Sequence, residues 1–134
     1  MAAVIAVGMA QAAPIDDAAR AVRAYRDDNG RVPLVASAEL MRAAQAHATD
    51  MLAQDYFGRT SKDGFKFTDR ITAQGIKTGF AAKNTAFGAT SGDAAIDLWI
   101  NSAPHKKNIL HRKAKQYGLG QAGKYRVMVL AAPC

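Results

Sequence analysis

The segment Val127-Met128-Val129-Leu130 near the C-terminus is the feature that most constrains the fold of this chain. Four consecutive apolar residues in an extended segment present hydrophobic side chains to both faces, so the strand must be covered on both sides. We therefore predict a central strand from Tyr125 to Ala131. A second strand, Gln116 to Gln121, precedes it and is joined to it by a turn at Ala122-Gly123.

Earlier segments show apolar residues at helical spacing, with residues that favour helix ends, at positions 16–30, 37–54 and 91–102. Ser37 is a suitable N-cap for the second of these helices, and Ser91 for the third. Residues 68–74 predict a short helix, and residues 79–88 predict a loop leading into or out of a short strand. Helices combined with a strand buried on both faces predict an α+β protein built as a three-layer α/β/α sandwich.

Residues 1–15 carry no charged side chain. This apolar run contains Ala10-Gln11-Ala12, which has the A-x-A form of a signal-peptide cleavage site. It predicts a signal-peptide remnant at residues 1–12, one domain at residues 13–134, and a secreted or periplasmic location. A buried N-terminal helix is the alternative interpretation of the same run.

Positive charge is concentrated toward the C-terminus. No Asp or Glu follows Asp97, whereas seven Lys and Arg residues do. Their summed charge of +7 equals the formal net charge of the whole chain, so residues 1–97 are neutral on balance. These cations are Lys106, Lys107, Arg112, Lys113, Lys115, Lys124 and Arg126. The asymmetry indicates an anionic partner, although a solvated basic face that only aids solubility agrees with it equally well.

The stretch from Trp99 to Leu110 contains a candidate site residue. Pro104 has no N–H and blocks continuation of the helix that ends at residues 101–102. His105 follows at the start of a short turn, and we predict that it faces a cleft. His47 lies on the apolar stripe of the helix at 37–54, where a structural role is expected.

Several motifs follow one another along the chain: His47-Ala48-Thr49-Asp50-Met51, Tyr56-Phe57-Gly58-Arg59, Lys83-Asn84-Thr85-Ala86, Pro104-His105-Lys106-Lys107-Asn108-Ile109-Leu110 and Tyr117-Gly118-Leu119-Gly120. In their order and spacing they resemble the bacterial branch of the CAP superfamily of SCP-like extracellular domains. That superfamily groups cysteine-rich secretory proteins, antigen 5 and pathogenesis-related 1 proteins. The resemblance implies an α/β/α sandwich, export from the cytoplasm and an open cleft.

In many members of that family, two histidines and two glutamates line the cleft and can hold a divalent metal. His105 matches one histidine, but the resemblance aligns Arg59 with the other and Lys83 with one glutamate, while Asn84 is kept. The second glutamate falls near residues 101–102, where no acid stands. Zinc and calcium sites commonly need three or four deprotonated donors, so we expect neither a metal nor a cofactor at this cleft.

The same substitutions predict a cationic cleft, with His47 and Trp99 structural or adjacent to it, and with Arg59, Lys83, Asn84, His105 and Lys106 as its residues. Guanidinium and ammonium groups suit phosphate and carboxylate. We therefore expect a non-enzymatic binding or envelope-interaction module for an anionic lipid, a cell-wall fragment or an acidic peptide, with at most peripheral contact with a membrane. A cleft that has decayed, with its side chains pointing apart, remains the alternative. Nucleic acid is not expected as a partner, because Tyr117 is the one aromatic residue near the basic segment.

The alternative function is a protease-like hydrolase in which His105 is the base and Ser61, Ser91 or Ser102 the nucleophile. Such a mechanism needs a third group that orients the base. The sequence shows neither a carboxylate placed for this role nor a G-x-S-x-G motif. Cys134, the single cysteine, is terminal, so it forms no internal disulfide and is a poor candidate nucleophile.

Overall fold

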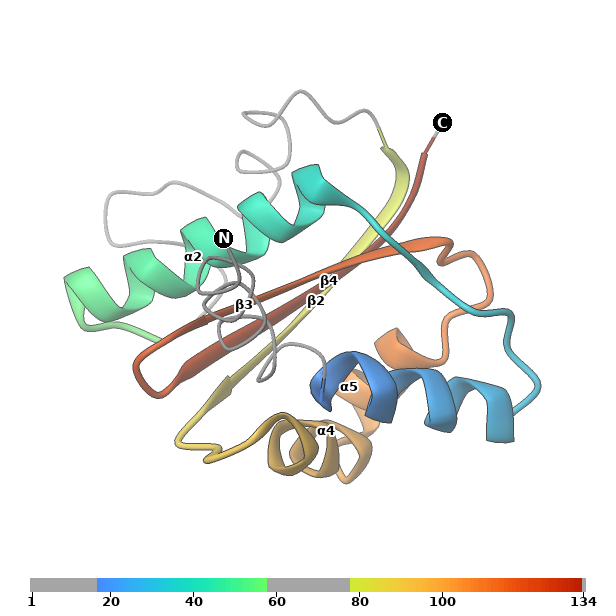
Figure 1. Cartoon of the computed structure of the whole chain (residues 1–134), viewed down its shortest axis with the longest axis horizontal. Helices are drawn as coiled ribbons and strands as arrows, with labels where there is room; N and C mark the ends of the chain where they lie inside the picture. The colour runs from blue at the N-terminus through green and yellow to red at the C-terminus, as the bar shows by residue number, and fades with distance from the viewer. Residues whose placement is uncertain (1–16, 58–77, 134) are drawn as a thin grey trace, which may run out of the picture.

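The computed structural model describes residues 17–57 and 78–133. The described chain forms helices and strands that alternate irregularly along the sequence (Figure 1). In chain order these are a helix at residues 17–28, β1 (Val35–Ala36), α2 (Ala38–Gln54), β2 (Thr78–Phe87), α4 (Gly92–Ile100), α5 (Ala103–Ile109), β3 (Gln116–Ala122) and β4 (Tyr125–Pro133).

The strands form one mixed sheet in the order β1-β3-β4-β2. The short β1 pairs in parallel with β3, whereas β4 is antiparallel to both of its neighbours. Gly123, with a positive φ of 56°, lies in the turn between β3 and β4. The predicted C-terminal strand pair is therefore confirmed.

Helices cover both faces of the sheet (Figure 1). Helix α2 lies on one face, and α4, α5 and the helix at residues 17–28 lie on the other. This arrangement confirms the predicted α/β/α sandwich.

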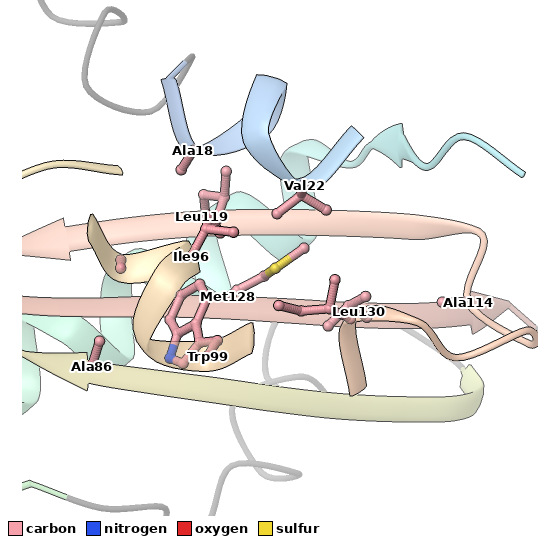
Figure 2. Close-up of a cluster of buried hydrophobic side chains, with 11 residues drawn as sticks. Ala18, Val22, Ala86, Ile96, Trp99, Ala114, Leu119, Met128 and Leu130 are labelled. Atoms are coloured by element: carbon pink, nitrogen blue, oxygen red, sulfur yellow. The ribbon is translucent and has the colours of Figure 1, made fainter. Parts of the chain in front are cut away.

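The side chains of β4 alternate between the two layers, as those of a strand must. Val127 and Val129 pack beneath α2, whereas Met128 and Leu130 pack in the opposite core. Figure 2 shows this second core, where Met128 and Leu130 lie with Trp99 of α4 and Val22 of the first described helix. All four β4 residues are fully buried, so the apolar run is explained by its central position.

Two glycines in β3 let α2 approach the sheet closely. A Cβ atom at Gly118 would lie 2.2 Å from the backbone of Leu40, and one at Gly120 would lie 2.5 Å from the backbone of Ala44. Any larger side chain at either position would force α2 away from the sheet. The Tyr117-Gly118-Leu119-Gly120 motif is thus a packing feature.

Local signals set the helix ends. The Ser37 side chain accepts a hydrogen bond from the Leu40 N–H at the start of α2, and Ser91 caps α4 in the same way. Pro104 lies in the first turn of α5, where its missing N–H costs nothing. The turn expected around His105 is therefore a seven-residue helix.

The expectation of a loop at residues 79–88 is wrong. These residues belong mainly to β2, a ten-residue strand that pairs with β4 from Thr78 to Phe87. The polar residues Lys83 and Asn84 obscured the strand in the sequence, because their burial depends on partners supplied by the helices on either side.

The signal-peptide remnant at residues 1–12, the short helix predicted at 68–74, and residues Arg59, Ser61 and Cys134 lie outside the described residues. Within the described ranges, no helix combines the length and apolar character needed to cross a membrane.

Candidate functional site

Strand β2 directs its consecutive residues Lys83 and Asn84 into opposite layers. Both are buried, with exposed fractions of 3% and 0%. Lys83 meets His47 of α2, whereas Asn84 meets α5. The alternation of a β-strand therefore assigns two neighbouring candidate residues to different environments.

The Lys83 ammonium lies 2.9 Å from Nε2 of His47, which is fully buried. The contact joins strand β2 to helix α2 through two buried polar side chains. The His47 ring lies edge-on to Tyr56 with centroids 6.1 Å apart, and the Tyr56 hydroxyl donates to Asp50 at 2.5 Å. These four side chains form a polar cluster between α2 and β2.

Asn84 fastens α5 to the sheet. Its amide nitrogen donates to the His105 carbonyl at 3.0 Å, and its oxygen accepts from the Asn108 amide at 2.9 Å. Close by, the Trp99 indole donates to the Thr85 carbonyl at 2.9 Å. Buried amides that are satisfied in this way fix the positions of α4 and α5 relative to β2.

His105 is half-buried in the first turn of α5, and its Nδ1 lies 3.1 Å from the Ser102 hydroxyl. Ser102 is the N-cap residue and His105 stands three positions after it. The two side chains contact each other in the first turn, and the Ser102 hydroxyl makes no capping hydrogen bond to the backbone of α5. The next residue, Lys106, is exposed.

The predicted cleft residues are therefore placed in several environments. Lys83 and His47 lie on the α2 side, whereas Asn84, His105 and Lys106 lie at α5. Trp99 is a buried core residue. Within residues 17–57 and 78–133, no group of three or more His, Cys, Asp or Glu side chains is arranged to hold a metal ion.

Arg26 was not singled out from the sequence, yet it is almost fully buried at 1% exposure. Its guanidinium donates to three backbone carbonyls, at 2.8 Å to Val32, 2.8 Å to Ile109 and 3.1 Å to His111. Burial, and then the charge of Arg31, lower the pKa of Arg26 from its ordinary value. The sequence held one signal for this role, because Arg26 follows Val22 by one helical turn and so lies on the apolar face of its helix.

The exposed cations at the end of α5 and in the turn after it form what we call the basic surface: Lys106, Lys107, Arg112 and Lys113. No acidic residue occurs after Asp97 to neutralise them from within this part of the chain. In the described part of the molecule, the ion pairs are Arg20 with Asp17 and Arg42 with Glu39, and both lie elsewhere.

A mixed sheet between two helical layers, with α5 fastened over the edge strand by the buried amide of Asn84, defines an SCP-like α/β/α domain. Residues 19–128 match the model of the cysteine-rich secretory protein family, CAP. The chain therefore belongs to the CAP family.

Two relatives from Bacillus subtilis are similar in sequence. The uncharacterized protein YkwD is 31% identical over 97 residues, a match that covers 72% of this chain and 38% of YkwD. The uncharacterized membrane protein YlbC is 32% identical over 82 residues, covering 61% of this chain and 24% of YlbC. The chain thus spans well under half the length of either relative.

Solved structures confirm the fold. An extracellular protein containing an SCP domain from Bacillus anthracis superposes with a TM-score of 0.80 at 24% identity, covering 83% of this chain and 37% of that one. An outer surface protein from Borrelia burgdorferi superposes with a TM-score of 0.82 at 14% identity, covering 90% of this chain and 93% of that one. At these identities the likeness extends to the fold alone.

Proposed function

We propose that this chain is an exported, non-enzymatic binding module that recognises an anionic component of the cell envelope. The basic surface is the observation that carries the proposal. Its four cations are exposed together on one helix end and the adjoining turn, with no acid in the last part of the chain. Clustered charge of one sign raises the local concentration of an oppositely charged ligand and speeds its association.

Export is supported by the uncharged segment at residues 1–15 and by two structural neighbours, one an extracellular protein and the other an outer surface protein. Fractionation of cells that express the full chain tests this part. Recovery of the chain from the medium or the periplasmic fraction supports export, and recovery from the cytoplasmic fraction contradicts it.

Of the residues predicted to form a cationic cleft, Lys106 belongs to the basic surface. We assign Lys83 and Asn84 to support of the interior, because each is buried and hydrogen-bonded to a helix. Arg59 remains a prediction. The ligand-binding part of the proposal therefore lies at α5 and its C-terminal turn rather than within the sandwich.

A thermal-shift and fluorescence-polarisation panel tests the binding function. It compares phosphate-bearing polymers, anionic vesicles, acidic peptides and neutral polysaccharides at low and high salt. We expect anions to bind at low salt, and binding to weaken steeply as salt rises because exposed charges are screened. Absence of binding by every anion at low salt would contradict the proposed function.

A hydrolase is the second candidate, and the 3.1 Å contact between Ser102 and His105 is the observation that favours it. The same contact has a structural explanation, since Ser102 and His105 stand three positions apart at the start of α5 and so lie on the same side of its first turn. Peptidase assays with the wild-type chain and with the Ser102→Ala and His105→Ala variants separate the two. Activity lost in both variants, with folding retained, supports the hydrolase.

A further inference from the structure

A groove lies between the loop that contains Arg31, helix α5 and the turn that follows α5. It is shallow and open to solvent, with a volume of about 510 Å³. The cations that line it are Arg31, Lys106, Lys107 and Arg112. Among the described residues, none of those lining the groove is acidic.

Arg31 is held in place before any ligand arrives. Its Nε donates to the Leu110 carbonyl at 2.6 Å, and its Nη1 donates to the Asn29 carbonyl at 2.7 Å. In the described part of the chain, Nη2 of Arg31 donates to no acceptor, so it keeps hydrogens for a ligand. A guanidinium already fixed by the backbone loses little conformational entropy when it binds an anion.

The chemistry of the lining suits phosphate, as it also suits carboxylate. A guanidinium fork fits two phosphate oxygens, and lysine ammonium groups add mobile point charges. Ala103 and Leu110 supply apolar surface between the cations. This combination suits a polymer in which phosphates alternate with C–H-rich linkers. The phosphates would contact the cations, and the linkers would contact the apolar side chains.

Two other classes of phosphate-bearing partner fit less well. The one aromatic ring in the lining, that of His111, is already stacked on Phe80 with centroids 4.0 Å apart, which removes a face for stacking nucleic-acid bases. None of the exposed large apolar side chains of the described region lines the groove. A membrane-docking face normally offers such side chains for insertion.

We propose that this groove, the basic groove, binds a base-free phosphodiester polymer through Arg31, Lys106, Lys107 and Arg112. The inference rests on the proposed function and makes it specific by naming the ligand class and the site. Phosphates lie against the cations, and the linkers lie against Ala103 and Leu110.

The probe is synthetic poly(glycerol phosphate), with fluorescence polarisation as the readout. Lys107→Ala/Arg112→Ala lowers affinity about tenfold at low salt, since two favourable charge contacts are lost. It also lowers the slope of log affinity against log salt by about 0.7 for each cation removed. The matched control, Arg42→Ala/Lys124→Ala, removes equal charge from α2 and the β3–β4 turn and leaves affinity within about twofold.

A second readout does not depend on affinity. Burial, followed by the charges of Lys113, Lys107 and Arg26, lowers the pKa of His111. A polyanion in the basic groove offsets those charges, so the pKa of His111 rises on binding in an NMR titration. The Arg42→Ala/Lys124→Ala variant shows the same rise.

The outcomes separate this inference from the proposed function. If both double variants lose affinity equally, net charge alone drives binding. That result overturns the assignment of binding to the basic groove but leaves the proposed binding function intact. Tighter binding to single-stranded DNA or to phosphatidylglycerol vesicles than to the probe overturns the ligand class. Failure of every anion to bind overturns both proposals.

Discussion

The polar groups around β2 and those of the basic groove differ in what they bind. Lys83 and Asn84 are buried and contact His47 and the His105 carbonyl. Lys107 and Arg112 are exposed, and no acid follows them in the chain. Two of the predicted cleft residues, Lys83 and Asn84, therefore have partners inside the fold, whereas Lys106, Lys107 and Arg112 are exposed at α5 and the turn after it.

Arg26 and Arg31 connect the two regions. Arg26 is buried and donates to the carbonyls of Ile109 and His111, whereas Arg31 donates to the intervening Leu110 carbonyl and lines the groove. Both arginines thus satisfy carbonyl groups at the C-terminal end of α5, which a short helix leaves without intrahelical partners. These hydrogen bonds hold the C-terminal end of α5 against the first described helix and the loop after it, and they also fix the position of Arg31 in the basic groove.

Arg26→Met has the largest expected effect. The substitution removes the hydrogen-bond donor for three buried or partly buried carbonyls. Each carbonyl left without a donor lowers the stability of the folded state. We expect the free energy of unfolding to fall by about 3 kcal/mol, measured by urea denaturation. Arg23→Met, an exposed position on the same helix, should change it by less than about 0.5 kcal/mol. Similar values for the two variants would contradict the role of Arg26.

Asn84→Leu comes next in size. The Asn108 amide loses its acceptor and the His105 carbonyl loses its donor, so the free energy of unfolding should fall by about 2 kcal/mol. The exposed amide of Asn101, which donates to the Asp97 carbonyl, provides the comparison. Asn101→Leu should cost less than about 1 kcal/mol. If the cost at the exposed amide matches that at Asn84, the buried amide does not fasten α5.

His111 gives a smaller, pH-dependent effect. Its pKa in the folded protein is lowered, whereas the unfolded value is about 6.5, so the unfolded state binds the proton more readily. The free energy of unfolding is therefore highest above about pH 6.5 and falls as the pH drops through the folded pKa. His111→Phe retains an aromatic ring against Phe80 and should flatten this part of the pH profile. Identical profiles for both proteins would refute the assignment.

The smallest expected effect concerns metal binding. Lys83 stands where the family resemblance places a glutamate, and it is already paired with His47. Isothermal titration with zinc should show no micromolar binding that depends on His105. Heat released by the wild-type chain and abolished by His105→Ala would contradict this expectation.

The parts of the fold that depend on local signals could be predicted. The caps at Ser37 and Ser91 and the central position of β4 follow from short sequence patterns, and the structure confirms them. Strand β2 could not be predicted because Lys83 and Asn84 are buried only through partners in other layers. Strand propensity and hydrophobic periodicity depend on the local sequence, so they do not reveal partners that come from distant segments.

Of the proposed basic groove, only the positive charge could be predicted from the sequence. The excess of cations after Asp97 is visible in the sequence. Its organisation into a groove is not, because Arg31 bonds to Leu110 across 79 positions and Arg26 bonds to Ile109 across 83. The predicted involvement of Lys83 followed from alignment with the family's glutamate, and the alternation of β2 directs that side chain toward α2.

The contrast between the interior and the basic groove is tested most directly by measuring two variants for both stability and affinity. Lys83→Met removes a buried amino group, and Lys107→Ala removes an exposed one. We expect Lys83→Met to lower the urea midpoint while leaving the affinity for poly(glycerol phosphate) unchanged, and Lys107→Ala to lower the affinity while leaving the midpoint unchanged. The reverse pattern, with affinity lost at Lys83 and kept at Lys107, would contradict the account.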